Sequence, residues 1–361
     1  MKPGGGWALL APLALGYGAA VSLRNTLYDK GLLPVQAPGP AVLSVGNLAA
    51  GGSGKTPLTL AFAHWLAKRA PELPLAIVSR GYGRRSHGVL VVADELGMIL
   101  SPEEGGDEPA LLAKELPGVP VIVAERRVEG IRTAAERFGA RIVLLDDAFQ
   151  HRAVGRDLDV VLLDETAPAW SWRLLPAGRL REPAGGLRRA QLVILSGGGP
   201  AALRRRVREW IGGYAPEAVV AEGSLGPRRL RVHGGEELYL PLERLRGLPV
   251  AAVCGIARPE RFFHTLEALG ASLIRRRALR DHAYPSTAER MKWKNDARRA
   301  GAKALVVTEK DAVKWPMEEG EPPVWVLETE WRWGAGREGV DDLLERFVET
   351  ARRRGTLHND K

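Results

Sequence analysis

An apolar run at residues 41–45 leads into a glycine-rich turn and then into Lys55 and Thr56, where a helical pattern begins. Glycines let backbone N–H groups approach phosphate oxygens without a Cβ in the way, and the positive end of the following helix attracts the same anion. A lysine and a hydroxyl at this position reach the outer phosphates and a bound Mg²⁺. The sequence therefore predicts a phosphate-binding loop for a nucleotide, built from Gly51, Gly52, Ser53, Gly54, Lys55 and Thr56.

One position of this loop departs from the usual G-x-x-x-x-G-K-[ST] spacing, because its first glycine would fall at Ala49. The alternative interpretation is a glycine-rich turn followed by a chance Lys-Thr. The apolar strand before the loop and the helical spacing of Leu58, Phe62 and Leu66 after it favour the nucleotide site.

A second apolar run, residues 142–145, ends in the acidic pair Asp146 and Asp147. A carboxylate at the end of a strand beside a phosphate loop is what Mg²⁺ binding in nucleotide hydrolases and kinases requires. An acidic pair after a strand is also a common turn, but the phosphate loop favours the functional interpretation. Gln150 and His151 follow closely and extend the candidate site.

Other polar residues allow two interpretations each. Asp107 and Glu108 begin a helical pattern, where they either cap the helix or hold Mg²⁺ and orient a base. Arg80 follows a strand directly and either grips a phosphate or is an ordinary surface residue. His282, next to an aspartate, is either a base or a structural histidine. Arg181 lies in a Pro/Gly-rich loop that either contacts substrate or only connects two elements.

The composition is that of a globular protein, with 361 residues, 45% hydrophobic residues and a net charge of +9. The single cysteine, Cys254, excludes an intrachain disulfide and fits a reducing cytosol. Arginine clusters such as 204–206 and 275–277 are either solvated faces or contacts for anionic partners. Since zinc-finger spacing and RNA-binding strands are missing, we expect no nucleic-acid partner.

Residues 7–23 form an uncharged stretch between Lys2 and Arg24. A signal peptide conflicts with cytosolic nucleotide chemistry, and a membrane span of this length, interrupted by Pro12 and two glycines, is marginal. We therefore expect a helix that lies on or dips into the cytoplasmic leaflet, with a helix that caps the soluble core as the alternative.

From residue 41 onward, short β-rich runs alternate with helical patterns, which predicts an α/β fold with a wound parallel sheet of the P-loop NTPase type. A second, smaller α/β unit begins near Pro249. The expected parts are an N-terminal membrane-docking helical segment at 1–40, a P-loop kinase core at 41–214, a strand-rich connector at 215–247, a C-terminal α/β domain at 248–352 and a flexible tail at 353–361.

Taken together, the motifs resemble those of the tetraacyldisaccharide 4′-kinases of lipid A biosynthesis. The resemblance covers most of the chain in order: Leu-Tyr-Asp-Lys-Gly near the N-terminus, Val-Gly-Asn47-Leu before the phosphate loop, Ser-Arg80-Gly-Tyr-Gly, Gly-Asp107-Glu-Pro, Asp146-Asp-Ala-Phe-Gln-His151, Leu-Pro-Ala-Gly178, Arg181-Glu-Pro, Asp281-His282 and Thr308-Glu-Lys-Asp-Ala-Val. Two positions depart from the family pattern. Ala148 stands where glycine is usual, and Arg179 stands where proline is common.

This resemblance implies that ATP phosphorylates the 4′-hydroxyl of a tetraacyldisaccharide 1-phosphate to give lipid IVA. It implies that Asp107 works with His282 as the base, with Lys55 as a further catalytic residue. Asn47 joins the loop residues in binding ATP. Mg²⁺ is expected near Thr56, Glu108, Asp146 and Asp147, and the substrate near Arg80, Gln150, His151 and Arg181.

The acyl chains of such a substrate stay in the bilayer, so we expect a monomer that docks peripherally or monotopically on the cytoplasmic face of the bacterial inner membrane. A nucleotide-driven partitioning ATPase is the rival class, but its loop carries an early lysine where this chain has Ala50. A kinase for another small sugar is a third class, and the apolar N-terminus counts against it.

Overall fold

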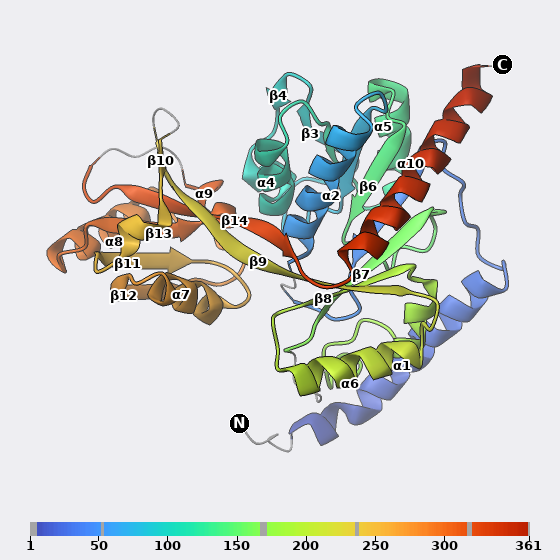
Figure 1. The fold of residues 1–361 in the computed structure, drawn as a ribbon, viewed down its shortest axis with the longest axis horizontal. Helices are drawn as coiled ribbons and strands as arrows, with labels where there is room; N and C mark the ends of the chain where they lie inside the picture. The colour runs from blue at the N-terminus through green and yellow to red at the C-terminus, as the bar shows by residue number, and fades with distance from the viewer. Residues whose placement is uncertain (1–5, 52–53, 167–171, 235–237, 316–319, 360–361) are drawn as a thin grey trace.

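The computed structural model describes residues 6–51, 54–166, 172–234, 238–315 and 320–359. Its strands form one continuous, mainly parallel sheet that passes through two lobes, as Figure 1 shows. The predicted α/β class is therefore confirmed. Gly52 and Ser53 of the predicted phosphate loop lie outside the described residues.

The larger lobe is built on a parallel set of strands in the order β8-β7-β1-β6-β2-β5, with two short antiparallel strands at its edge. In β1, Val45 lies beside Asp146 of β6 and Val160 of β7, so the loop after β1 emerges between these two strands. The bounds are β1 (Ala41–Gly46), β2 (Leu75–Ser79), β3 (Leu90–Asp94), β4 (Gly97–Met98), β5 (Val121–Val123), β6 (Ile142–Asp146), β7 (Leu158–Asp164) and β8 (Leu192–Ser196).

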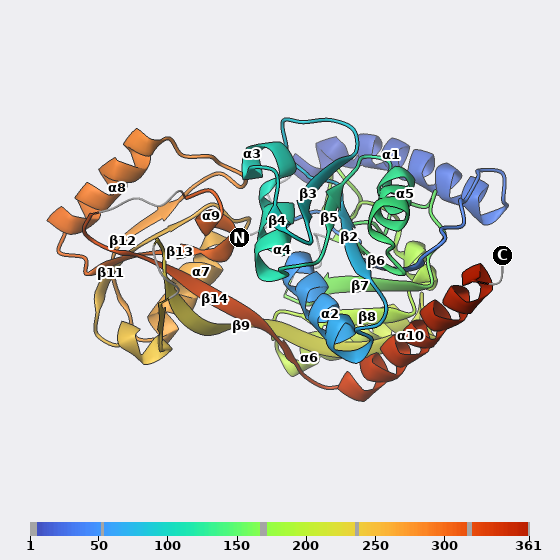
Figure 2. The same cartoon turned by 90° about the horizontal axis from the view of Figure 1, so that it is seen from above.

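Alternate residues of these strands face opposite layers of helices, as expected for a period of two. Leu43 and Val45 face one apolar cluster with α2, α4 and α10, whereas Val42 packs with α5 and Val193 with α6 on the other face. Figure 2 shows the sheet between α5 and the α2–α10 layer. The bounds are α2 (Lys55–Arg69), α3 (Pro102–Gly105), α4 (Asp107–Glu115), α5 (Arg127–Phe138), α6 (Ala201–Gly212) and α10 (Arg337–Asn359), with a 3-10 helix, η2 (Ala184–Arg189), before β8.

The smaller lobe continues the sheet with parallel strands in the order β12-β11-β13-β14. Its core gathers Phe262 and Leu266 of α7 against Val250 of β11. The bounds are β11 (Pro249–Cys254), α7 (Pro259–Ala268), β12 (Ser272–Ala278), α8 (Thr287–Arg299), β13 (Ala304–Thr308), α9 (Glu309–Ala312) and β14 (Val324–Trp333), preceded by β10 (Tyr239–Leu240) and η3 (Leu242–Leu245).

A long antiparallel ribbon joins the lobes, where the sequence pattern predicted several short strands. Residues 219–232 form one strand, β9 (Val219–Val232), which pairs with β8 at its start and with β14 from Gly223 to Val232. Pro227 has no backbone N–H to donate. It is tolerated in the strand because it lies beside a register shift between Glu328 and Thr329, where an extra residue in β9 interrupts the ladder of hydrogen bonds. After the ribbon, α10 returns to pack Leu344 and Phe347 on the larger lobe, although it was expected to close the smaller one. It also continues to Asn359, into the segment 353–361 that was predicted to be a flexible tail.

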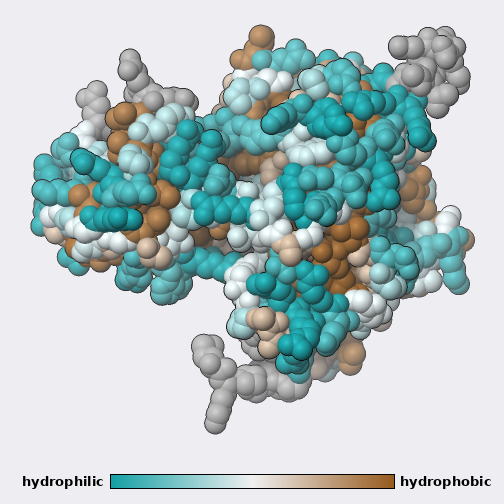
Figure 3. All heavy atoms as spheres, in the orientation of Figure 1, coloured by the Kyte–Doolittle hydropathy of each residue, from teal (hydrophilic) through white to brown (hydrophobic). Residues whose placement is uncertain are grey.

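Helix α1 (Gly6–Asp29) lies along the outside of the larger lobe, and Figure 2 shows it on the opposite side of that lobe from α6. Its inner side is tied down by polar contacts: the Tyr17 hydroxyl donates to the Arg181 carbonyl at 2.6 Å and the Asn25 amide donates to Glu182 at 3.0 Å. Among the residues that the structure describes, no helix is long and apolar enough to cross a bilayer. On the face that carries α6 and α10, Figure 3 shows mostly hydrophilic side chains with a hydrophobic band between these two helices.

Close backbone approach at Gly46 generates a testable prediction. A Cβ at this position would lie 2.6 Å from the Phe149 Cβ and 2.8 Å from its backbone nitrogen, neither of which can move freely. We expect Gly46→Ala to lower the free energy of unfolding by about 1–3 kcal/mol, measured by urea denaturation. Gly16→Ala is the control, because Gly16 lies in α1 with open space around it, so alanine should be neutral or stabilising. Equal destabilisation by the two substitutions would contradict this account.

Candidate active site

The phosphate loop begins where β1 ends, at the carboxyl edge of the sheet, where ligands of wound α/β folds bind. Gly51 and Gly54 have φ angles of 113° and 90°, a left-handed backbone that glycine adopts without strain. Gly54 is followed directly by Lys55 at the start of α2, so free backbone N–H groups and the positive helix end face the same space. The described part of the loop therefore has the backbone of an anion site.

Asp146 at the end of β6 is buried, and one of its oxygens accepts a hydrogen bond from the Thr59 hydroxyl at 3.1 Å. The other oxygen is buried without a hydrogen-bond partner among the described residues. Burial, and then the nearby carboxylates of Glu108 and Asp147, raise the pKa of Asp146 to about 7. An acidic group in this state has an open coordination position for a cation.

Asp147, the next residue, behaves in the opposite way. Its φ angle of 50° turns the side chain toward two cations: Arg181 at 2.7 Å and Lys55 at 3.7 Å. Burial opposes ionisation of Asp147, but Lys55 and Arg181 outweigh it and lower the pKa of the carboxyl below its usual value. Asp147 therefore holds the lysine of the phosphate loop in place as a fixed anion.

The second part of the site joins the two lobes. Asp107 at the start of α4 is 1% exposed, and its Oδ1 accepts a hydrogen bond from Nδ1 of His282 at 2.8 Å. His282 lies in the loop after β12 of the smaller lobe, with a left-handed φ of 60°. The hydrogen bond to Asp107 raises the pKa of His282, although burial works against it. The sequence pattern left the structural and catalytic roles of these residues open, and the fold brings them into direct contact.

Two lysines on and after α9 complete this cluster, and sequence reasoning gave them no role. Lys314 lies 3.5 Å from Asp107 Oδ2, and Lys310 lies 3.6 Å from the same oxygen and 3.5 Å from Glu108. Burial opposes ionisation of Asp107, whereas the bond from His282 and the lysine charges lower its pKa. One signal in the sequence could have revealed the two lysines. Lys310 and Lys314 follow a predicted strand and are four residues apart, a spacing that places both side chains on one side of a helix.

The expected substrate residues have different surroundings. Arg80 is exposed one residue after β2. Gln150 donates to the Asn47 carbonyl at 2.9 Å and to the buried Glu182 at 2.9 Å. These bonds hold the backbone just before the phosphate loop in place. Burial and the neighbouring arginines, Arg127 first, lower the pKa of His151 to about 4, so the ring is neutral. Contacts of these residues with substrate stay a prediction.

Arg179 lies against the phosphate loop. Its Nε donates to the Ala50 carbonyl at 2.9 Å, its own carbonyl accepts from the Ala50 N–H at 2.7 Å, and its guanidinium lies over Gly51. On the same side, Arg258 of the smaller lobe pairs with Asp164 at the end of β7. Arg179 thus holds the phosphate loop through Ala50, and it does so at a position where proline is common in the similar family.

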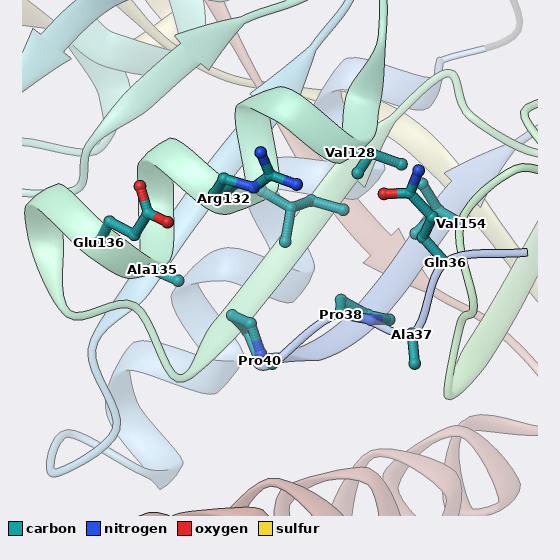
Figure 4. A pocket seen from close by; sticks show the side chains of 11 residues that line it. Gln36, Ala37, Pro38, Pro40, Val128, Arg132, Ala135, Glu136 and Val154 are labelled. Atoms are coloured by element: carbon teal, nitrogen blue, oxygen red, sulfur yellow. The ribbon is translucent and has the colours of Figure 1, made fainter.

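A hollow of about 230 Å³ lies elsewhere, between α5 and the segment 36–40 that precedes β1 (Figure 4). Pro38 and Pro40 line it from one side and Val128 and Arg132 from the other. It contains none of the residues of the phosphate loop or of the Asp107–His282 cluster. We therefore place the candidate active site at the phosphate loop and not in this hollow.

Comparisons with known proteins show the family to which the chain belongs. A family model described as tetraacyldisaccharide-1-P 4′-kinase matches residues 6–349. The tetraacyldisaccharide 4′-kinase of Anaeromyxobacter sp. (strain K) is 47% identical over 313 residues, covering 84% of this chain and 81% of that protein. The enzyme of that name from Chlorobaculum tepidum is 40% identical, covering 84% and 85%. A crystal structure of LpxK from Aquifex aeolicus in complex with ATP has a TM-score of 0.74 and 31% identity, covering 94% of this chain and 99% of that one.

The contact of Arg179 with the loop predicts a defect in nucleotide affinity. In Arg179→Pro the backbone carbonyl that accepts from Ala50 remains, but the side-chain hydrogen bond is lost, which costs about 0.5–1.5 kcal/mol. We expect the Kd for ATP, measured by calorimetry, to rise about two- to tenfold. Arg206→Gln, which removes an exposed arginine on α6, should leave the affinity unchanged. An Arg179→Pro protein with the affinity of the wild type would show that the contact does not order the loop.

Proposed function

Because the chain belongs to the tetraacyldisaccharide 4′-kinase family and is a kinase, we propose that it transfers the γ-phosphoryl group of ATP to the 4′-hydroxyl of a tetraacyldisaccharide 1-phosphate. The observation that carries the assignment of the base is the 2.8 Å contact between His282 and the buried Asp107. The pair lies across the junction of the lobes, and Lys310 links it to Glu108, whose charge acts on Asp146.

Phosphoryl transfer is mainly a problem of alignment and charge, because the protein has little covalent chemistry to perform. The backbone of the phosphate loop and Lys55 would hold the β- and γ-phosphates. Lys55 is now paired with Asp147, so the phosphates enter a site whose lysine is already oriented. Asp147 stays paired with Arg181 when the lysine turns to the nucleotide.

The hydroxyl of the acceptor must lose its proton as it attacks. With Nδ1 of His282 donating to Asp107, the lone pair of a neutral ring lies on Nε2, which would take that proton. Asp107 then stabilises the imidazolium that forms, as in other carboxylate–histidine pairs. A base positioned in this way contributes typically about 10²–10⁴-fold to the rate.

The residues present fit a Mg²⁺ ion. Mg²⁺ is usually bound by one or two carboxylates together with substrate phosphates, not by a complete protein cage. Asp146 offers a buried oxygen without a partner in the described structure. Thr56, in the first turn of α2 beside the phosphate loop, offers a hydroxyl. Among the described residues no three His, Cys, Asp or Glu side chains form a ready-made metal cluster. When bound, the ion would neutralise charge on the phosphates.

Of the four expected ligands of Mg²⁺, Asp147 is paired with Arg181 and Glu108 is paired with Lys310. These two carboxylates would act on the ion at a distance or after rearrangement.

Helix α1 would bring the enzyme to its lipid substrate at the cytoplasmic face of the inner membrane, as a monomer bound peripherally. Tyr17 and Asn25 face the protein, whereas Leu13 and Leu15 are 63% and 75% exposed. Since Tyr17 contacts the backbone of Arg181, the same helix is anchored to the loop that reaches Asp147. The membrane-facing helix and the catalytic edge are therefore connected through one segment.

The kinase proposal predicts which variants make labelled lipid. We expect the wild type to transfer labelled γ-phosphate to tetraacyldisaccharide 1-phosphate in detergent micelles with Mg²⁺. His282→Gln and Asp107→Asn should lower kcat by about 10²–10⁴-fold, while ATP binding is retained. Lys55→Ala should lose transfer through loss of phosphate binding. Release of free phosphate without lipid labelling, at a rate independent of the acceptor, would support a switch ATPase and contradict the proposal.

The membrane proposal predicts that vesicle binding depends on the leucines of α1. Burying a leucine is worth about 1.5–3 kcal/mol, so Leu13→Ser together with Leu15→Ser should weaken binding to anionic vesicles by more than about tenfold in a flotation assay. Leu96→Ser is the matched control, because Leu96 is 98% exposed in the turn between β3 and β4. Equal binding of the wild type and the double variant would contradict membrane docking through α1.

A further inference from the structure

Lys310 has no part in the proton transfer described above, although its ammonium lies at the centre of the cluster. Nζ lies 3.4 Å from Nε2 of His282, the ring nitrogen that points away from Asp107 and that would receive the proton. The residue comes from α9, which follows β13 in the smaller lobe. This position raises the question of what a cation does beside a base.

The hydrogen-bonding chemistry of the two groups answers part of it. An ammonium has three donors and no acceptor, so Lys310 can bond Nε2 only when that nitrogen carries a lone pair. Nδ1 of the same ring bonds the carboxylate of Asp107 and must therefore carry the proton. The two contacts together are compatible with a single state of the ring: neutral, with hydrogen on Nδ1 and the lone pair on Nε2.

Three carboxylates hold the ammonium at this place. Nζ lies 2.9 Å from Asp281, 3.5 Å from Glu108 and 3.6 Å from Asp107. Burial opposes the charge on Lys310, but Glu108 and Asp107 outweigh it and raise the pKa of the lysine. Lys310 is thus a fixed cation and not a neutral amine that competes for the proton.

The other neighbours of the ring act in the opposite direction or are uncharged. Asp107 contacts Nδ1 from α4, Asp281 lies 3.8 Å from Nε2 within the same loop, and the Tyr82 ring lies edge-on with its centroid 5.1 Å away. Asp107 and Asp281 favour protonation of the imidazole, and Lys310 is the cation that disfavours it. Without Lys310, burial alone would oppose the effect of the two aspartates on the ring.

We propose that Lys310 is a positioning residue that keeps the His282 base unprotonated, with its lone pair on Nε2, until the acceptor hydroxyl takes the place of the ammonium. The inference rests on the proposed function, since it concerns the preparation of the same base. The carboxylates around Nζ would keep the displaced cation close to the negative charge that develops during transfer. Lys310 would therefore first keep the base unprotonated and then stabilise the negative charge on the transferred phosphoryl group.

The pH dependence of the reaction tests this role. The acid limb of kcat/KM reports the pKa of the base in the free enzyme. Lys310→Met removes the opposing charge, so protonation becomes easier and the acid limb should move to higher pH, by about 1 unit. Lys310→Arg keeps the charge and should keep the limb close to that of the wild type. A limb that stays in place or moves to lower pH in Lys310→Met would overturn the proposal.

A matched control comes from Lys314, which also neutralises Asp107 but makes no hydrogen bond to the ring in the described structure. Its Nζ lies 3.5 Å from Asp107 Oδ2 and 3.4 Å from Asp311. Lys314→Met should lower activity or stability without moving the acid limb upward as Lys310→Met does. The same upward shift in the two variants would mean that the charge on Asp107, and not the contact with Nε2, sets the protonation of the base, and would also overturn the proposal.

A direct measurement separates this inference from the kinase assignment. Protein labelled with ¹⁵N-histidine, with the His282 signals identified by their loss in His282→Gln, reports the tautomer and pKa of the ring by NMR. We expect hydrogen on Nδ1 in the wild type and a higher His282 pKa in Lys310→Met and Lys310→Gln. If the wild type labelled no lipid, the kinase proposal would fail while this titration still decided the role of Lys310. An active wild type whose His282 titration did not depend on Lys310 would reject the inference alone.

Discussion

A carboxylate as deeply buried as that of Asp107 must be met by cations or donors, because leaving a buried charge unpaired costs about 3–5 kcal/mol. Here the compensating groups are His282, Lys310 and Lys314, and all three belong to the smaller lobe. The larger lobe therefore contains a buried acid whose charged partners all come from the smaller lobe. The same contacts therefore fix the arrangement of the two lobes and the position of the His282 base.

The acidic pair at the end of β6 shows how neighbouring residues of the same type take different roles. Asp146 continues the strand into the buried interior, and its pKa rises to about 7. Asp147 turns into a left-handed conformation, contacts Arg181 and Lys55, and stays ionised. Nothing in the local sequence separates the two carboxylates, because the difference arises from a change of backbone conformation and from partners more than thirty residues away.

Much of the larger lobe could be predicted from the sequence, because apolar runs and helical patterns alternate clearly from residue 41 onward. The phosphate loop and the acidic strand end followed from local spacing, whereas the partnership of Asp107 and His282 came from the family resemblance. The ribbon strand β9 was predicted only as short runs, because Gly226, Pro227 and several arginines interrupt its pattern, and its full length depends on pairing with β14, β8 and β10. Lys310, Lys314 and Arg179 also escaped, since their importance lies in distant contacts and not in their spacing.

The pairing of β9 with β14 makes the sheet continuous from one lobe to the other. Two lobes joined by a flexible peptide can separate in any direction, but these lobes share ladder hydrogen bonds that resist being pulled apart. Twisting a two-stranded ribbon keeps those bonds intact, because strand pairs tolerate a wide range of twist. A movement of the lobes that preserves the ladder is therefore limited to twisting of the ribbon, which would rotate the smaller lobe relative to the catalytic edge without separating the two.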